Sequence, residues 1–371
     1  MSLLTGGREA LLVLSDGTEF EGEAIGAESS PAATGTGAVA TGELVFNTAL
    51  SGYQEIVTDP SYAGQVITFT YPHIGNYGVN ADDDESRRPF CSGVIVRDLS
   101  RLASNWRSEG SLTTLLERHG VPGIAGIDTR RLTRHLRQHG ALPCAMGTGD
   151  LEALSAAARA ATGTDGCDLA SIVTTPTAYS VGTGPLRVVA LDLGIKRTIL
   201  AHLAPFATVE VVPAHTTAAE ILSLEPDGIF LSNGPGDPGA LGGVAATVAE
   251  LVGSRPLLGI CLGHQVLAGA LGGATYKLPF GHHGSNHPVK NLTTGQVEIT
   301  AQNHNYAVEA GSVPGAVVTH LNLNDGVIEG IAIDSADAVS VQHHPEAGPG
   351  PHDAAYLFDD FARRMAAAKR S

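Results

Sequence analysis

The residue with the clearest chemical signal is a cysteine that stands where an apolar run meets a helical one. Cys261 lies in the sequence GICLG, after the apolar segment 257–260. Glycines two positions before and after it allow the tight strand-to-helix turn that exposes a nucleophile at its tip. The following helix N-terminus favours the thiolate, and the amide N–H of Leu262 would face a developing oxyanion. Lone cysteines are usually inert buried thiols, but the paired glycines favour a nucleophile here.

A thiolate nucleophile needs a proton carrier, and His344 is the candidate. It follows the apolar segment 338–342, and Glu346 stands two residues after it. Residues two apart on an extended chain point the same way. A carboxylate beside an imidazole fixes the tautomer of the ring and stabilises imidazolium. By itself this segment is equally typical of a surface histidine or half of a metal site. Together with Cys261 it predicts a Cys–His–Glu triad.

A third segment, SNGPGDP at 232–238, follows the apolar run 228–231. Its two glycines and two prolines predict a rigid loop whose backbone can approach a ligand closely. Loops at the carboxyl ends of strands form the usual ligand edge of an open α/β sheet. The N–H of Gly236 could therefore supply a second oxyanion donor. Without the other motifs, the same segment would be read as a plain tight turn.

The second half of the chain alternates apolar and amphipathic segments. Strands are expected at 186–192, 208–213, 228–232 and 257–261, and helices at 195–203, 217–224, 244–252 and from 263. This alternation predicts a parallel sheet with right-handed crossovers. Further strands at 297–300, 317–320, 327–333 and 338–342 lack long helices between them, which predicts an antiparallel extension. A last helix is expected at 354–368.

The first half has a different pattern, with strands expected at 10–14, 43–47, 65–70 and 93–97. Asp16-Gly17 is a hairpin signal, and residues 29–42 are expected to form a loop. Helices are expected at 112–119 with Ser111 as its cap, at 129–139 with Asp128 as its cap, and at 150–161. Residues 174–184 show no core pattern and are taken as the boundary between domains 1–175 and 185–371. The predicted fold is α/β, with an N-terminal mixed α/β domain and a C-terminal open, mostly parallel sheet flanked by helices.

Composition excludes several classes of protein. The 371 residues carry a formal charge of −16, which disfavours nucleic-acid and anionic-membrane surfaces. The cysteines form no C-x-x-C pair, and no signal peptide or membrane span is expected, so we predict a cytoplasmic protein. The histidines at 282, 283 and 287 lack the spacing of a metal site, and no metal is expected. No ATP-binding G-x-x-x-x-G-K motif is present.

These motifs resemble the class I (triad) glutamine amidotransferases, through GICLGHQ at 259–265, SNGPGDP at 232–238 and HPE at 344–346. The whole chain is similar to the small, glutamine-hydrolysing subunits of carbamoyl phosphate synthetase. GYQEIVTDPSY at 52–62 and YPHIGN at 71–76 carry this narrower resemblance, because other triad amidotransferases lack that N-terminal domain.

The resemblance implies a role for each matching residue. Cys261 is the expected nucleophile, His344 the general base and acid, and Glu346 the carboxylate that orients it. The expected glutamine contacts are Ser61, Gly234, Gly236, Leu262, Gln265, Asn303, Asn305 and Tyr306. Ser61 belongs to the N-terminal domain, so the resemblance implies a substrate at the domain junction. Asn305 departs from the family, which usually has glycine there; if the position needs positive φ, asparagine is the best substitute.

The resemblance also implies a partner, the large synthetase subunit, which uses ATP, Mg²⁺ and bicarbonate to make carbamoyl phosphate for arginine or pyrimidine synthesis. No cofactor is expected in this chain, its N-terminal domain is the candidate docking surface, and the holoenzyme is expected to form higher oligomers of heterodimers. Two alternatives stay open: a triad amidotransferase serving another synthase, and a non-catalytic binding or regulatory module, which the departure at Asn305 would fit.

Overall fold

The computed structural model describes residues 8–27 and 39–370. The chain forms two compact units that divide between Asp165 and Gly166. We had expected domains 1–175 and 185–371, with 174–184 as the boundary. Instead, strand β10 (Tyr179–Val181) pairs with a strand of the second unit's sheet. A short edge strand buries little apolar surface, so its sequence lacks the pattern by which strands are recognised.

The first unit is built on a closed barrel. Its strands, in order around the barrel, are β1 (Glu9–Leu14), β2 (Glu19–Gly26), β8 (Pro122–Ala125), β6 (Gly93–Val96), β4 (Gln65–Phe69), β3 (Val39–Asn47) and β9 (Leu142–Gly147). The hairpin predicted at Asp16-Gly17 joins β1 to β2. Strand β3 begins at Val39, so the end of the expected loop 29–42 is wrong, and residues 28–38 lie outside the described part of the chain. A two-stranded sheet joins β5 (His73–Ile74) to β7 (Asp98–Leu99).

Three of the four helices that the structure describes in the first unit were predicted, and the one at 53–58 was not. The four helices are α1 (Tyr53–Thr58), α2 (Leu112–Arg118), α3 (Thr129–His139) and α4 (Leu151–Ala160). Ser111, Asp128 and Asp150 each accept a hydrogen bond from a backbone N–H in the first turn of α2, α3 and α4. Each cap satisfies an amide that the helix itself leaves without an acceptor. Two 3₁₀ turns, η1 (Pro60–Tyr62) and η2 (Ala81–Asp83), complete this unit.

The second unit contains a ten-stranded sheet in the order β10-β12-β11-β13-β14-β19-β18-β17-β15-β16. Its parallel centre consists of β12 (Ala207–Pro213), β11 (Leu186–Asp192), β13 (Gly228–Leu231), β14 (Leu257–Ile260) and β19 (Ala338–Val341). The antiparallel extension consists of β18 (Ile328–Ile333), β17 (Val317–Asn322), β15 (Thr275–Asn291) and β16 (Val297–Val308). A parallel core and an antiparallel extension were both predicted, but the strand expected at 338–342 was assigned to the extension, whereas β19 pairs parallel with β14.

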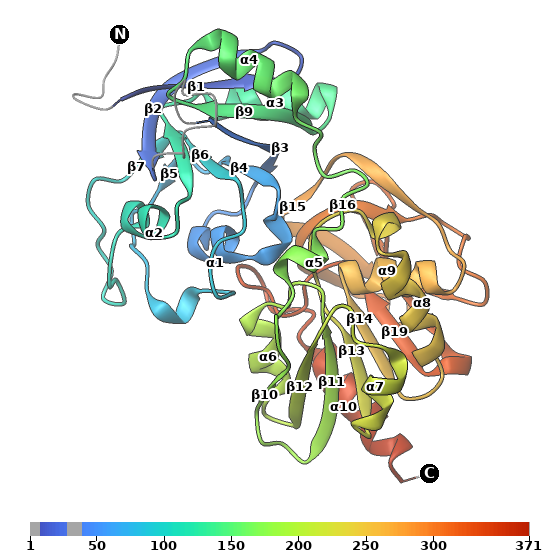
Figure 1. Ribbon diagram of the computed structural model, residues 1–371. Coiled ribbons are helices and arrows are strands. Elements are labelled where there is room, and N and C mark those ends of the chain that lie inside the picture. The colour runs from blue at the N-terminus through green and yellow to red at the C-terminus, as the bar shows by residue number, and fades with distance from the viewer. Residues whose placement is uncertain (1–7, 28–38, 371) are drawn as a thin grey trace. The chain divides into compact units, whose positions relative to one another are not determined.

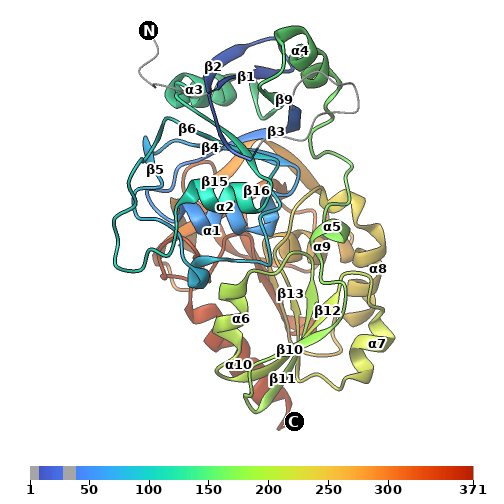
Figure 2. The same cartoon turned by 60° about the vertical axis from the view of Figure 1, so that its left-hand side comes forward.

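Helices cover both faces of the parallel strands (Figures 1 and 2). On one face, α6 (Arg197–Leu203) and α10 (Tyr356–Ala368) pack against the sheet. On the other face lie α5 (Ala170–Val173), α7 (Ala218–Ser223), α8 (Gly242–Leu251) and α9 (Leu262–Ala270). Apolar side chains fill both layers, which is why the central strands read as continuous apolar runs. A 3₁₀ turn, η3 (Pro238–Ala240), follows β13, and another, η4 (Asp334–Ala336), precedes β19.

Strand β15 corrects the sequence analysis. No strand was expected at the segment GHHGSNHPV, but it lies within this strand of 17 residues. Strand β16 is also longer than the predicted 297–300, and in its pairing with β15 His282 stands opposite His304. Glycine, proline and histidine hide the alternation of a strand, and shifts of register interrupt the pairing. The pairing with β16, which is remote from local sequence signals, makes this segment a strand.

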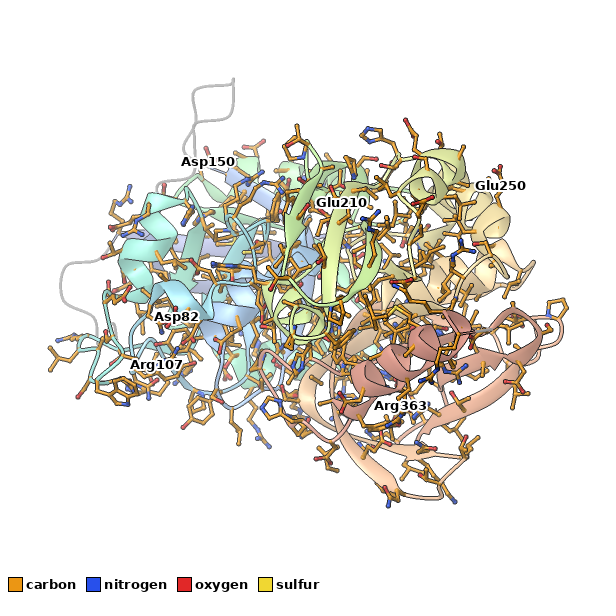
Figure 3. All side chains as sticks on the ribbon, turned by 90° about the horizontal axis from the view of Figure 1, so that it is seen from below. Asp82, Arg107, Asp150, Glu210, Glu250 and Arg363 are labelled. Carbon is orange, nitrogen blue, oxygen red and sulfur yellow. The ribbon has the colours of Figure 1, made fainter. Side chains whose placement is uncertain are left out.

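Charged side chains gather on the outside of each unit. Of the side chains labelled in Figure 3, Glu210 is half-buried and the other five, including Arg107 and Glu250, are exposed. Arg107 forms an exposed ion pair with Asp83 at 2.6 Å. Among the described residues, no helix has the length and apolar character needed to cross a membrane.

Candidate active site

Cys261 lies at a strained corner between strand β14 and helix α9. Its φ is 53° and its ψ is −105°, a backbone conformation that side chains other than glycine rarely adopt. Its N–H donates to the carbonyl oxygen of Val341 (2.9 Å), and its own carbonyl accepts from the N–H groups of His264 and Gln265. These bonds from the sheet and the helix hold the corner in place. The predicted nucleophile elbow is therefore present in its geometry.

The glycines on either side of Cys261 are needed for close packing. A Cβ on Gly259 would come 2.8 Å from the carbonyl oxygen of Gly263, and one on Gly263 would come 2.2 Å from that of Leu231. Because backbone atoms cannot yield as a flexible side chain can, a larger residue at either position would open the turn. Leu262, as the first residue of α9, has an amide N–H with no acceptor inside the helix.

Two strands bring groups to Cys261 from elsewhere in the sheet. The Sγ of Cys261 lies 3.5 Å from the carbonyl oxygen of Asn303 on β16. His344 follows β19, the parallel neighbour of β14, and its N–H donates to the carbonyl oxygen of Ala301 on β16 (2.9 Å). The charge of Cys261 also raises the pKa of His344. Parallel strands β14 and β19 thus deliver the cysteine and the histidine to one edge of the sheet.

The ring of His344 is held by a buried carboxylate. Its Nδ1–H donates to Oε1 of Glu346 (2.7 Å), which leaves Nε2 free of hydrogen-bonded acceptors among the described residues. The same oxygen of Glu346 accepts from Nζ of Lys196 (3.0 Å), and this Nζ also donates to the carbonyl oxygen of Ala347 (2.7 Å). His344, Glu346 and Lys196 are all buried. The carboxylate therefore orients the imidazole while a lysine neutralises it.

Lys196 is the residue that sequence analysis missed. It follows strand β11 at the same edge of the sheet, in the run DLGIK. Lysine is almost never fully buried unless it is paired, and the side chain here is 2 % exposed. The available signal was a lysine shortly after a mostly apolar strand. Nothing local to Lys196 indicates that its partner is 150 residues away.

The charges at this site are strongly coupled. Burial alone would lower the pKa of His344, but the negative charges of Glu346 and Cys261 outweigh it and raise the pKa to about 10. Burial alone would raise the pKa of Glu346, but Lys196 and His344 outweigh it and lower the pKa to about 2. An imidazolium can therefore persist beside an ionised carboxylate. Together with a thiolate at Cys261, this imidazolium would supply both a nucleophile and the proton for a leaving group.

The loop after β13 is rigid, as predicted. The side chain of Ser232 accepts from the N–H of Leu193 (2.8 Å), and its carbonyl accepts from the N–H of Gly263 on α9 (3.0 Å). A Cβ on Gly234 would come 2.0 Å from the carbonyl oxygen of Leu193, and Gly236 has a φ of 94°. Both glycines are thus required by the backbone, and the loop is tied to the helix that begins at the elbow.

The expected glutamine contacts on α9 and β16 lie beside this centre. Gln265 donates from Nε2 to the carbonyl oxygen of Tyr306 (2.8 Å) and to Oε1 of Gln342 (3.0 Å). These bonds connect helix α9 to β16 and to the end of β19. Gln265 therefore holds the wall of the site in place, and its contact with glutamine, like that of Tyr306, stays a prediction.

Asn303 and Asn305 share one buried histidine, His283 of β15. The Oδ1 of Asn303 lies 2.9 Å from Nδ1 of His283, and that of Asn305 lies 2.9 Å from Nε2. Burial lowers the pKa of His283 to about 4, so the ring is neutral and its single N–H donates to one of the two amide oxygens. Asn305 lies within strand β16 and does not have a positive φ. The backbone conformation at this position therefore does not require glycine.

Ser61 belongs to the first unit and is described there alone. It lies in the turn η1, is buried, and its N–H donates to the side chain of Asp59 (2.8 Å). This Asp-Pro-Ser turn gives Ser61 a defined conformation. Its contact with glutamine stays a prediction.

A second buried group lies in the antiparallel part of the sheet. His282, His304 and Glu329 place one donor atom each within 4.8 Å of the others, the geometry of a possible metal site. Ligand spacing in the sequence had predicted no metal, because Glu329 is 25 positions beyond His304 and spacing rules apply only to short motifs.

Comparison with known proteins supports the division of the chain. Residues 12–146 match the family model described as carbamoyl-phosphate synthase small chain, CPSase domain. Residues 189–364 match the model described as glutamine amidotransferase class-I. The first match falls within the barrel unit, and the second spans the sheet that carries Cys261, His344 and Glu346.

Relatives match along nearly the whole chain. The carbamoyl phosphate synthase small chain of Syntrophotalea carbinolica is 48 % identical over 382 residues, covering 98 % of this chain and 99 % of the relative. That of Akkermansia muciniphila is 48 % identical, covering 97 % and 98 %. That of Chlorobaculum tepidum is 50 % identical, covering 96 % and 97 %. With both family models matched and both units covered by these relatives, the chain belongs to the carbamoyl phosphate synthase small chain family.

Proposed function

We propose that this protein is the glutamine-hydrolysing subunit of a carbamoyl phosphate synthetase. The observation that carries the proposal is Cys261, held at a strained elbow and coupled to an imidazole whose other nitrogen is bound to a buried carboxylate. A structural cysteine needs neither the strain nor the charged partners. A non-catalytic module would have no use for the pairing of Lys196 with Glu346 behind the histidine.

The first half of the reaction transfers an acyl group to sulfur. The Cys261 thiolate attacks the carbon of the glutamine γ-carboxamide, and the N–H groups of Gly236 and Leu262 stabilise the oxyanion. The C–N bond then breaks as the imidazolium of His344 gives its proton to the departing nitrogen. Ammonia leaves, and a γ-glutamyl thioester remains on Cys261. Glu346 stabilises the imidazolium before transfer and fixes the tautomer of the neutral ring afterwards.

The second half hydrolyses the thioester. Neutral His344 accepts a proton from water, and the resulting hydroxide attacks the thioester carbon. The C–S bond breaks, which releases glutamate and restores the thiolate beside imidazolium. We infer that Ser61, Gly234, Gln265, Asn303, Asn305 and Tyr306 bind glutamine or hold the residues that do so.

The chemistry of ammonia implies a partner. In neutral water ammonia is mostly ammonium, which is not a nucleophile, so it must pass to an acceptor by a protected path. Relatives of this chain are named as small chains, which supports a large-subunit partner. We infer that this partner uses ATP, Mg²⁺ and bicarbonate to form carbamoyl phosphate for arginine or pyrimidine synthesis. The barrel unit is the proposed docking surface, and this chain itself requires no cofactor for glutamine hydrolysis.

The proposed cellular setting is a reducing cytoplasm. Cys91, Cys144, Cys167 and Cys261 are all free thiols. A thiolate nucleophile also needs reducing conditions to avoid oxidation, which supports this placement. The assembly of heterodimers into larger oligomers is proposed as well, and sedimentation of the reconstituted holoenzyme would measure it.

Covalent trapping tests the proposal directly. The full chain, alone and with its large subunit, is treated with a glutamine analogue that carries an electrophilic chloroketone in place of the carboxamide. We expect one adduct per chain, mapped by peptide mass spectrometry to Cys261, and loss of glutaminase activity in step with labelling. Glutamine should protect against labelling, and Cys91→Ala should be labelled like the wild type. Labelling at another cysteine, or hydrolysis by Cys261→Ala, would contradict the proposal.

A further inference from the structure

A group of buried side chains outside the glutaminase centre has the properties of a metal site. We propose that His282, His304 and Glu329 bind a divalent transition metal, best suited to Zn²⁺, that joins three strands of the second unit. The site would be structural, because its three donors are buried in the sheet.

The three donors come from three strands. His282 is on β15, His304 is on β16 and Glu329 is on β18. His282 and His304 stand opposite each other in the β15–β16 pairing. Their donor atoms and one oxygen of Glu329 lie within 4.8 Å of one another. The pairing of the strands thus brings two imidazoles and a carboxylate close together, and no strand has to move relative to another.

Two nitrogens of this group face acceptors instead of donors. The Nε2 of His282 lies 2.7 Å from Oδ2 of Asp325, so its proton is there and Nδ1 presents a lone pair. That buried Nδ1 has no hydrogen-bond partner and lies 3.8 Å from Oε1 of Glu329, too far for a hydrogen bond. Both nitrogens of His304 also face oxygen acceptors, because Nδ1 lies 2.8 Å from the carbonyl oxygen of Tyr306 and Nε2 lies 3.0 Å from Oε1 of Gln302. A neutral ring donates to only one of them, so its other nitrogen presents a lone pair.

The remaining bonds resemble those that orient metal ligands. Metal-binding histidines usually donate their other N–H to a carboxylate or a backbone carbonyl, and His282 and His304 each face such an oxygen here. Glu329 is held by the side-chain amides of Asn322 (2.8 Å) and Gln302 (2.9 Å). The first binds one carboxylate oxygen and the second binds the other. All three donors are therefore fixed in direction before any ion binds.

The buried negative charge of Glu329 also favours the binding of a cation. Its side chain is fully buried, and within the described residues its ion pairs are with His282 and His343, without any lysine or arginine. A buried carboxylate is costly unless a positive group or a metal balances it. Zn²⁺ between Glu329 and the two imidazoles would supply that charge.

The donor set favours Zn²⁺ over Mg²⁺ or Ca²⁺. Two imidazole nitrogens and one carboxylate oxygen suit Zn²⁺, whereas the hard cations prefer oxygen ligands. Tetrahedral Zn²⁺ spaces its ligand atoms roughly 3.3 Å apart, so the donors must close by on the order of 1 Å. His287 offers a fourth donor, because its buried Nδ1 has no partner and its ring centre lies 5.1 Å from that of His282.

The position of His304 suggests what the metal would do. Asn303, the preceding residue, has its carbonyl 3.5 Å from the Sγ of Cys261, and its side chain bonds to His283. A metal that fixed β16 to β15 and β18 would therefore stiffen the strand that lines the nucleophile. We expect metal removal to lower the stability of the second unit and to raise the KM for glutamine more than it lowers kcat.

Metal binding itself is the primary test. The full chain is stripped with a chelator, and Zn²⁺ alone is titrated by isothermal calorimetry; Co²⁺ is then bound and its visible spectrum recorded. We expect one ion per chain and the absorption of a tetrahedral Co²⁺ site. Glu329→Gln and His282→Asn should each lower the affinity at least about 100-fold, since even outer partners of a ligand are worth 10–100-fold. Circular dichroism checks that each variant is folded.

Matched variants separate this site from other thiols and histidines. His135→Asn removes a histidine that is paired with Asp16 at 2.6 Å in the first unit, and it should bind Zn²⁺ like the wild type. Cys261→Ser should also retain one ion per chain while abolishing glutamine hydrolysis, so the two proposals fail independently. Absence of stoichiometric Zn²⁺ binding, or equal binding by Glu329→Gln, would overturn the site.

A measurement on the wild type covers the case in which the variants do not fold. X-ray absorption of the Zn²⁺-loaded chain should show nitrogen and oxygen ligands, at the roughly 2.0–2.2 Å typical of zinc, with imidazole scattering. A sulfur ligand at about 2.3 Å would assign the ion to a cysteine and refute the proposal.

Discussion

Two buried carboxylates of the second unit bind histidines, and they differ in what balances their charge. Glu346 lies between His344 and Lys196, a permanent cation within 3.0 Å. Glu329 has only histidines as ion-pair partners among the described residues, and one of them, His282, has an unpartnered nitrogen. The pKa of each carboxyl group is lowered, although burial by itself would raise both.

The comparison shows that a histidine beside a buried carboxylate can serve two purposes. Where lysine supplies the charge, the imidazole is free to exchange a proton with Cys261. Where no lysine is present, the imidazoles and the carboxylate have donor capacity left for a cation. Both sites contain a histidine beside a carboxylate. The glutaminase centre and the proposed metal site therefore differ mainly in the positive group that balances that carboxylate.

The largest effect is expected from Glu346→Gln. The substitution removes the acceptor of His344 Nδ1–H and leaves Lys196 buried without its carboxylate. Loss of the equivalent carboxylate in a triad lowers kcat by about 10⁴-fold, and we expect a loss of that order. Steady-state glutamine hydrolysis with the large subunit measures it, and exposed Glu250→Gln is the control. Retention of kcat within tenfold would show that Glu346 does not orient His344.

Lys196→Met tests whether the lysine balances the buried charge of Glu346. Glu346 would keep only His344 as a partner in the core, and breaking a buried pair typically costs about 3–5 kcal/mol of unfolding free energy. Lys369→Met is a matched control, because Lys369 pairs with Asp227 at 2.9 Å while 54 % exposed. A surface pair of this kind contributes about 0–1 kcal/mol. Urea unfolding of both variants measures the difference, and equal losses would contradict the role assigned to Lys196.

The charge balance also predicts how stability depends on pH. The raised pKa of His344, about 10, means that its contribution is complete below its ordinary value of 6.5 and is lost as pH rises to 10. The lowered pKa of Glu346, about 2, means that its contribution is complete above 4.5 and is lost as pH falls to 2.

Thermal unfolding from pH 6 to 10 measures the alkaline side of this dependence. Cys261→Ser removes one of the negative charges that raise the pKa of His344, so its alkaline loss should begin at lower pH than in the wild type. Coincident profiles for the two proteins would show that Cys261 and His344 are not coupled.

The smallest effect is expected from Asn305→Ala, which removes one of two amides bound to His283. A single net hydrogen bond contributes about 1 kcal/mol, so we expect a loss of that size in unfolding free energy. The KM for glutamine should change by no more than several-fold, with kcat retained. A loss of hydrolysis as large as that of Glu346→Gln would make Asn305 part of the reaction itself.

Local signals predicted much of the fold. The caps Ser111 and Asp128 were identified because a capping side chain acts on residues two or three positions away. The parallel strands were identified because burial on both faces makes them apolar throughout. The closed barrel of the first unit and strand β15 were not predicted, because strand order and pairing depend on partners far away in the chain.

The sequence by itself determined the nucleophile elbow, because Gly259, Cys261 and Gly263 are neighbours and their steric needs are met within one turn. It also determined the pairing of His344 with Glu346, two residues apart on an extended chain. Only the tertiary structure decided that Lys196 would meet Glu346, and that Glu329 would meet His282. These contacts join strands whose order in the sheet is set by packing of the whole unit, a free-energy balance that no short segment encodes.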